Sequence, residues 1–154
     1  MDRRRLGVLG GAFLTAAAVA PVAKADEDES THSLEGGWVG TTNAGPGFGT
    51  FQALYTFAAG GGMVTSSSID LSPRSLSTPG YGTWARRGPD TFAFTFEAFV
   101  FDQQGNPSGT VQAHSTVTLN GDTFSGPFTF SVMSPTGQIV FSGSGTHSAT
   151  RIRP

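Results

Sequence analysis

From Leu34 to the C-terminus, short apolar stretches alternate with turn signals, and none has the apolar period of about 3.6 residues that marks a helix. The stretches keep the period of two that places side chains on the two faces of a strand. Gly, Pro and Asn in the breaks supply the backbone angles that a chain reversal requires. The sequence therefore predicts an all-β fold with eight strands, at Gly37 to Thr42, Thr50 to Ala58, Met63 to Asp70, Gly82 to Arg87, Thr91 to Asp102, Thr110 to Leu119, Thr123 to Met133 and Gln138 to Ile152.

Sequential strands with short connections form an up-and-down antiparallel sheet, which avoids exposed edges by closing into a barrel. The last four predicted strands agree in parity across three hairpins, with one face mostly apolar and the other rich in Thr, Ser and Gln. We expect the apolar face to point inward with five phenylalanines: Phe94, Phe96, Phe128, Phe130 and Phe141. Gly126, Gly143 and Gly145 on this face predict either tight coiling of the strands or free space beside the rings.

The stretch Thr91 to Asp102 is apolar on both faces, because Phe99 and Phe101 have the opposite parity to Phe92, Phe94 and Phe96. A β-bulge near Glu97-Ala98 would return Phe99 and Phe101 to the inner face, and this is the preferred interpretation. The alternative places both rings outside, where they form an apolar patch for a partner such as a second copy of the chain, or lie under the loop from Leu71 to Gly80.

Residues 1–25 have the three-part pattern of a secretory signal peptide. A basic start is followed by an apolar run from Leu6 to Ala20 and by the small residues of an Ala-Lys-Ala cleavage box. We expect cleavage after Ala25 and a secreted or periplasmic mature protein without a membrane span, since the apolar run is short of the roughly 20 residues that a transmembrane helix needs. Arg3, Arg4 and Arg5 before Leu6 also resemble the twin-arginine export signal.

The charge balance excludes several classes of function. Removal of residues 1–25 takes away four of the nine basic and one of the eleven acidic residues, which leaves a formal charge of −5. Four acids in the run Asp26 to Glu29 predict a solvated, disordered tail over residues 26–34, before a barrel domain over residues 35–154. No basic patch remains, so we expect neither nucleic acid nor anionic lipid as a partner.

The residues that the chain lacks narrow the chemistry further. There is no Cys, and the only Lys is Lys24, so thiol and Schiff-base mechanisms are excluded for the mature chain. The three His are scattered without an acidic cluster, and we expect no metal and no cofactor. Glu97 and His114 have matching parity, and we interpret them as an exposed pair on the outer wall rather than an acid–base pair. We expect His147 to be a hydrogen-bonded residue at the barrel rim.

The segment Gly36-Gly37-Trp38 is similar to the Gly-x-Trp that opens lipocalins and related calycin barrels, and the chain ends with Arg151 and Arg153. In lipocalins an Arg near the end of the last strand packs across that Trp and closes the barrel base, and the resemblance assigns this role to Arg151. The resemblance covers Gly36 to Ile152. It implies a calycin-like barrel with an interior that binds small apolar molecules. The chain also resembles small secreted bacterial proteins of unassigned activity.

Two classes of function follow. The first is a secreted barrel that binds a small hydrophobic ligand among the five inner phenylalanines, with Tyr81 and Trp84 near a mouth formed by the loop from Leu71 to Gly80. The second is a barrel enzyme of the cyclase or isomerase type, similar to allene oxide cyclases or polyketide cyclases, which holds an apolar substrate folded. A barrel filled by its own side chains is the structural alternative. Glu, Tyr or Arg side chains that point inward would favour the enzyme; no catalytic residue is assigned.

Overall fold

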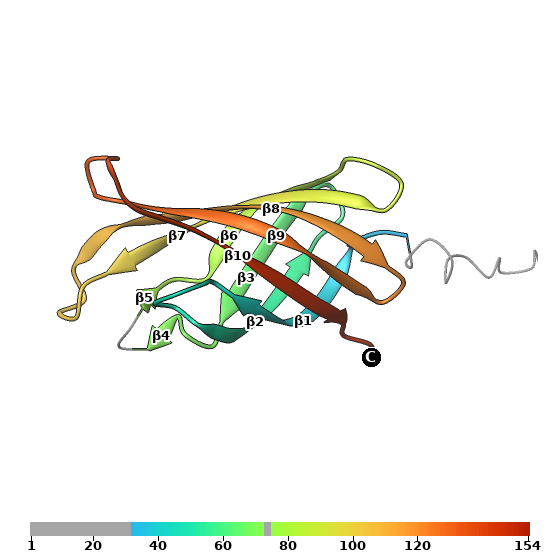
Figure 1. The fold of residues 1–154 in the computed structure, drawn as a ribbon, viewed down its shortest axis with the longest axis horizontal. Coiled ribbons are helices and arrows are strands. Elements are labelled where there is room, and N and C mark those ends of the chain that lie inside the picture. Colours follow the sequence, from blue (N-terminus) through green and yellow to red (C-terminus); the bar gives the residue numbers. More distant parts are fainter. Residues whose placement is uncertain (1–31, 73–74) are drawn as a thin grey trace, which may run out of the picture.

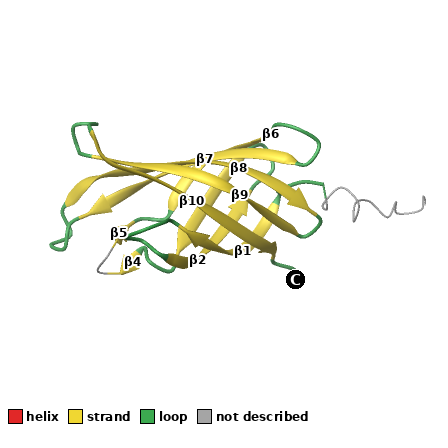
Figure 2. Cartoon of the chain, in the orientation of Figure 1, coloured by secondary structure: helices red, strands yellow, loops and turns green. Residues whose placement is uncertain are grey.

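The computed structural model describes residues 32–72 and 75–154, and in these ranges every regular element is a β-strand (Figure 1, Figure 2). No helix in this part of the chain is long and apolar enough to cross a membrane. The predicted signal peptide and residues 26–31 of the predicted acidic tail lie outside the described residues. The strands are β1 (Gly36–Asn43), β2 (Thr50–Phe57), β3 (Gly62–Ser67), β4 (Leu71–Ser72), β5 (Ser75–Ser77), β6 (Gly80–Arg86), β7 (Thr91–Phe101), β8 (Pro107–Asn120), β9 (Thr123–Met133) and β10 (Ile139–Arg151).

Eight of these strands close into an antiparallel barrel, as the sequence predicts. Each strand of the barrel pairs with its neighbours in the order β1, β2, β3, β6, β7, β8, β9 and β10. The pairing of β10 with β1 closes the ring. The predicted loop from Leu71 to Gly80 is instead largely the small hairpin of β4 and β5. This hairpin extends the sheet beside the end of β7, where Leu76 lies opposite Phe101.

The register of the last four strands confirms the predicted parity. Phe94 of β7 lies opposite Ser115 of β8, which lies opposite Phe128 of β9. Phe128 in turn lies opposite Gly145 of β10. The inner face therefore follows directly from the period of two in the sequence.

The preferred interpretation of Phe99 is wrong. The pairing of β7 with β8 is unbroken through Ala98, which lies opposite Val111, and Phe99, which lies opposite Thr110. Ala98 is buried, whereas Phe99 points outward with 61% of its surface exposed. The irregularity in β7 comes later, between Val100 and Phe101. No bulge re-aims Phe99 because Ala98 keeps the inward parity, so the outer placement given by the alternative holds for this ring.

One end of the barrel, which we call the base, is the end where β1 begins and β10 ends (Figure 1). The opposite end, where β2 and β10 begin, is the mouth. A cluster of buried apolar side chains fills the base, and its fully buried members include Leu34, Trp38, Phe57, Phe92 and Phe124. Leu34 comes from the segment that the sequence assigns to the acidic tail, and its carbonyl accepts a 2.8 Å hydrogen bond from Trp38 Nε1.

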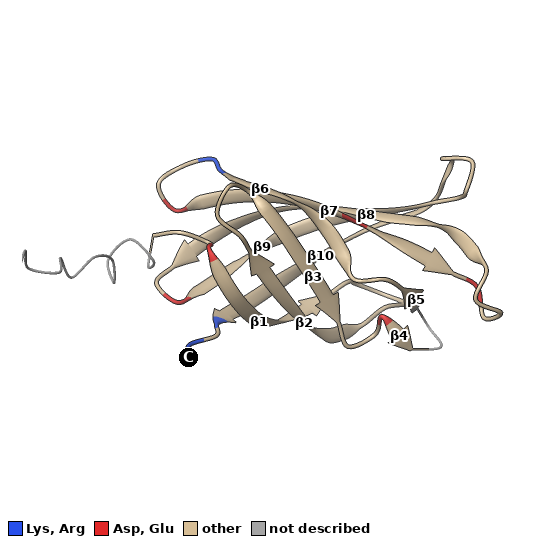
Figure 3. Cartoon of the chain, turned by 180° about the vertical axis from the view of Figure 1, so that it is seen from behind, with Lys and Arg blue, Asp and Glu red and all other residues tan. Residues whose placement is uncertain are grey.

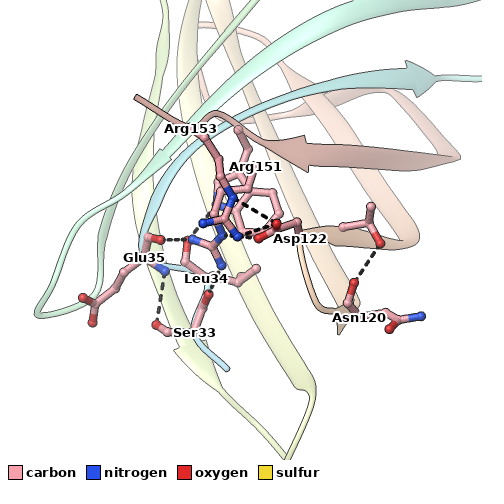
Figure 4. A network of polar contacts seen from close by, with 9 residues as sticks. Ser33, Leu34, Glu35, Asn120, Asp122, Arg151 and Arg153 are labelled. Atoms are coloured by element: carbon pink, nitrogen blue, oxygen red, sulfur yellow. Dashed lines mark hydrogen bonds and ion pairs between the residues drawn. The ribbon is translucent and has the colours of Figure 1, made fainter. Parts of the chain in front are cut away.

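Arg151 closes the base in the way that the calycin resemblance implies. Its guanidinium carbon lies 4.2 Å from the centre of the Trp38 ring, within the range of a cation–π contact. The same guanidinium donates to the carbonyl oxygens of Ser33, at 2.7 Å, and Glu35, at 2.5 Å (Figure 4). Asp122 lies 3.3 Å from Arg151 Nε and also accepts from Arg153. These contacts tie the last strand to the segment that precedes the first.

Candidate ligand cavity

A cavity of about 140 Å³ occupies the barrel interior on the mouth side of the core. Its walls are mostly apolar, with rings from β2, β7 and β9 and small side chains between them. These apolar lining residues include Phe51, Phe96, Phe128 and Phe130 together with Ala44, Ala53, Ala98 and Ala113. Phe48, in the connection between β1 and β2, packs against Phe130 at the rim, with ring centroids 5.5 Å apart. The barrel is therefore filled at the base and hollow toward the mouth.

The cavity exists because two rings lie against the wall. A Cβ atom added at Gly143 would come within 2.6 Å of the Phe130 ring, and one at Gly145 within 2.7 Å of the Phe128 ring. The glycines therefore do not border empty space, which corrects the expectation that they leave room beside the rings. They allow each ring to lie close to the backbone of β10, and the space is left in the centre of the barrel instead.

His147 lies at the floor of the cavity, where the hollow meets the base cluster. Its ring is sandwiched between Phe94 and Phe128, with centroids 5.4 Å and 5.3 Å away and interplanar angles of 28° and 24°. Only 6% of the residue is exposed. Its Nε2 atom has no hydrogen-bond partner among the described residues. The predicted rim position is wrong, because β10 carries His147 well below the rim, and its Nε2 atom does not make the predicted hydrogen bond with any described residue.

Ser115, Tyr55 and Thr42 are residues with hydroxyl groups that line the cavity together with His147. Ser115 is 5% exposed, and its Oγ atom is buried without a hydrogen-bond partner in the described part of the chain. Tyr55 and Thr42 satisfy each other through a 3.1 Å hydrogen bond between their hydroxyl oxygens. Two of the residues that line this otherwise apolar cavity therefore each have a buried polar atom without a hydrogen-bond partner among the described residues: Nε2 of His147 and Oγ of Ser115.

The titratable groups at the floor are neutral at ordinary pH. Removal from water lowers the pKa of His147 from 6.5 to about 4. The same desolvation raises the pKa of Tyr55 above its usual value of 10, and the hydrogen bond with Thr42 offsets this only in part. The floor consequently offers neutral hydrogen-bonding groups and no charge.

The Arg, Asp and Glu residues occur mostly toward the two ends of the barrel (Figure 3). Arg86, Arg151 and Arg153 are at the base, at or beyond the ends of β6 and β10. Asp70 is the one charged residue among those described that line the cavity, and it lies just beyond β3 at the mouth. Its carboxylate accepts hydrogen bonds from Ser66, at 3.1 Å, and from the backbone N–H of Ser67, at 2.7 Å. This carboxylate organises the turn after β3.

The seven residues predicted to bind a ligand do not all meet at the cavity. Phe96, Phe128 and Phe130 line it. Phe94 is buried in the base cluster and supports His147 from below. Phe141 is 44% exposed and packs on Phe130 with ring centroids 5.7 Å apart, which places it at the rim.

Tyr81 and Trp84 do not line the cavity. Tyr81 lies opposite Glu97 on the outer wall and is 64% exposed. Trp84 points inward, but β6 begins at the mouth with Gly80, so at about 3.3 Å per residue Trp84 lies more than 10 Å further toward the base. There it packs on Phe57, and its Nε1 donates to the carbonyl of Ala58. The prediction underestimated how far β6 carries Trp84 from Gly80 at the end of the predicted mouth loop.

Glu97 and His114 lie on the outer wall, as interpreted from the sequence, but they do not pair with each other. Gln112 lies between them, donating to Glu97 at 2.6 Å and contacting His114 Nε2 at 3.0 Å. His114 Nδ1 is also 2.9 Å from the Thr95 hydroxyl. These are exposed contacts, two between β7 and β8 and one within β8, and not an acid–base pair.

Tyr55 and Ser115 are functional candidates that sequence reasoning missed. Parity places Ser115 on the inner face, but nothing in the sequence shows that its hydroxyl lacks a partner. Tyr55 alternates with Ala53 and Phe57 in β2, and the same parity argument could have placed it inside. Within residues 32–72 and 75–154, no group of three or more His, Asp or Glu could hold a metal ion. The chain matches no protein-family model and no curated protein, so its function is argued from the geometry of the cavity.

Proposed function

We propose that this protein is an exported barrel that binds a small hydrophobic molecule in the cavity at its mouth. The observation that carries the proposal is a cavity of about 140 Å³ bounded by aromatic rings and alanines in an otherwise packed barrel. Protein interiors are normally packed to the density of organic crystals, and a void of this size leaves its walls without contacts. A bound apolar molecule restores those contacts. Export rests on the signal-like pattern of residues 1–25.

The cyclase or isomerase alternative gains support from Tyr55 and His147, since inward-pointing titratable side chains favour an enzyme. A general base works best with a pKa near the operating pH, and His147, with a pKa of about 4, is a weak one. Tyr55 has its pKa raised by burial and is a correspondingly weak acid. These protonation states suit hydrogen bonding to a ligand better than proton transfer, and binding is therefore the function we favour.

The test is a substitution that fills the cavity without disturbing the wall. Ala113→Leu adds atoms to a 3% exposed inward position that lines the cavity, and Thr116→Leu places the same side chain on the outer wall of the same strand. Toluene binding, measured by titration calorimetry on mature protein, should be saturable in the wild type and in Thr116→Leu and absent in Ala113→Leu. Because the added atoms enter a void, the free energy of unfolding of Ala113→Leu should change by less than about 1 kcal/mol. Equal toluene binding by both variants would refute the proposed cavity.

A further inference from the structure

Two cavity-lining residues that each have an unpaired polar atom point to a specific chemical group on the ligand. His147 Nε2 and Ser115 Oγ are buried, belong to residues at least nine-tenths buried, and line the same cavity. Buried polar atoms in folded proteins are almost always hydrogen-bonded, so each unpaired one calls for a partner. The hydroxyl groups of Tyr55 and Thr42 are hydrogen-bonded to each other. The partner required at the floor must therefore come from outside the described side chains.

A hydroxyl group meets this requirement better than an ether, a ketone or a hydrocarbon does. A neutral imidazole has one donor and one acceptor nitrogen, and the tautomer decides which of them Nε2 is. A serine hydroxyl donates and accepts. A ligand hydroxyl also does both, so it can pair with Nε2 and Ser115 Oγ in either tautomer. An ether or ketone only accepts, and a hydrocarbon leaves both atoms unpaired.

The electrostatics of the cavity favour an uncharged ligand. Neither Arg nor Lys occurs among the described residues that line the cavity. Asp70 at the mouth is negative and would repel an anion on its way in. Burial lowers the pKa of His147 to about 4, so the imidazole supplies no positive charge at neutral pH. A carboxylate placed at the floor would be desolvated without a counter-charge, which is strongly unfavourable.

The volume and the walls of the cavity indicate the size and shape of the apolar part of the ligand. Its volume of about 140 Å³ is close to that of an apolar protein cavity of about 150 Å³ that accepts benzene. Phe96, Phe128 and Phe130 present ring surfaces that favour offset or edge contacts with another ring. A single aromatic ring fits both the volume and the walls.

We infer that the preferred ligand is a neutral single-ring molecule with one hydroxyl group, bound with that hydroxyl at His147 and Ser115 and its ring among Phe96, Phe128 and Phe130. The inference rests on the proposed function and narrows it. It differs from simple hydrophobic binding in one respect that can be measured. A purely apolar cavity prefers toluene to phenol, because phenol must lose its hydrogen bonds to water on entry. A floor that replaces those bonds reverses the preference.

The experiment compares phenol, toluene and benzoate, which share one ring, by titration calorimetry of mature protein at neutral pH. We expect phenol to bind about tenfold more tightly than toluene, as one well-placed buried hydrogen bond allows, and benzoate not to bind at millimolar concentration. Ser115→Ala, which removes only the hydroxyl, and His147→Leu should each bring the phenol-to-toluene ratio down to one or below. Ser144→Ala, an exposed serine on β10, is the matched control and should keep the wild-type ratio.

The outcomes separate this inference from the function beneath it. Toluene binding that is saturable but as tight as or tighter than phenol binding would overturn the hydroxyl inference and leave the binding function intact. The same holds if Ser115→Ala leaves the ratio unchanged, since that variant retains the shape of the cavity. Absence of binding by all three compounds would overturn both. Thermal unfolding of each variant confirms that it is folded, and Ser115→Ala alone decides the matter if His147→Leu does not fold.

Discussion

His147 is a buried titratable residue surrounded by aromatic rings. Phe94 and Phe128 cover the two faces of its ring, and the rings of Tyr55 and Phe124 meet it at 86° and 81°. Burial among these rings removes the imidazole from water, and this desolvation favours its uncharged form. The pKa of about 4 in the folded protein is therefore well below the value of 6.5 in an unfolded chain, and the difference links protonation of this one ring to folding.

The linkage predicts a pH dependence of stability. The unfolded chain takes up the proton near pH 6.5, whereas the folded protein does so only near pH 4. The contribution of His147 is thus fully present above pH 6.5 and is lost as the pH falls toward 4, by on the order of 3 kcal/mol. Urea unfolding at several pH values should show this loss in the wild type and a smaller one in His147→Leu. Identical slopes would contradict it, and a nuclear magnetic resonance titration of the His147 ring gives its pKa independently.

At the scale of the strands, the fit between β9 and β10 decides how much of the barrel is hollow. Phe128 and Phe130 lie opposite Gly145 and Gly143 in the register of these two strands. A glycine across from an aromatic residue lets the ring cover its backbone closely, a pairing that also pins the register. Both rings are thereby held against the wall instead of in the lumen.

The two glycines should respond differently to an added methyl group. At Gly143 the new Cβ would meet ring atoms of Phe130 at 2.6 and 2.7 Å, and that ring can swing into the cavity. At Gly145 it would meet the backbone oxygen of Asn43, which is fixed in β1, as well as the Phe128 ring. We expect Gly143→Ala to lower the free energy of unfolding by less than about 1 kcal/mol while weakening toluene binding, and Gly145→Ala to lower it by about 2 to 3 kcal/mol. Chemical denaturation and calorimetry measure both, and the reverse order would show that the rings do not lie as described.

The strand scale is also where sequence reasoning succeeded and failed. Register in β7 to β10 could be predicted because a one-residue slip would turn every inward ring outward. The course of β7 past Glu97 could not be predicted. An apolar residue that stays on the outer face gives the same sequence pattern as one that a bulge returns to the inner face. Phe99 shows the ambiguity, and only the pairing of the neighbouring strand resolves it.

The cavity itself was harder to predict than the strands that enclose it. Whether Phe128 fills the lumen or lies flat on Gly145 depends on the orientation of its ring. The alternation of apolar and polar residues in the sequence does not indicate that orientation. The lack of a partner for Ser115 Oγ likewise depends on distances between strands that are remote in sequence. The composition of the inner face could thus be predicted, but the free space and the free hydrogen bonds within it could not.

The whole molecule is a barrel with two unlike halves along its axis. The base is packed with fully buried rings and sealed by Arg151 over Trp38, while the mouth contains the cavity and has the rings of Phe48 and Phe141 at its rim. Without Cys, the fold has no disulfide to stabilise either end. The base must therefore provide most of the stability, and the mouth is free to serve binding.

This division predicts unequal effects of the same truncation. Phe124 is 1% exposed and contacts the rings of Trp38 and Tyr55 with centroids 5.0 and 5.6 Å away, so Phe124→Ala should lower the free energy of unfolding by about 3 to 5 kcal/mol. Phe130 already faces a void on one side. The loss in the free energy of unfolding caused by Phe130→Ala should therefore be about 2 kcal/mol smaller than the loss caused by Phe124→Ala. Urea unfolding provides both values. Equal losses would mean that the mouth is packed as tightly as the base.

Every barrel strand runs through both halves, and this has a consequence for how the protein fluctuates. In many proteins the weakly stable unit is a separate loop or hairpin that opens on its own. Here the boundary between firmly and loosely held structure crosses the middle of each of the eight strands. Amide hydrogens of one strand should therefore exchange with solvent slowly near the base and faster near the mouth. Local opening of the barrel then begins at the mouth, while the hydrogen bonds at the base remain closed.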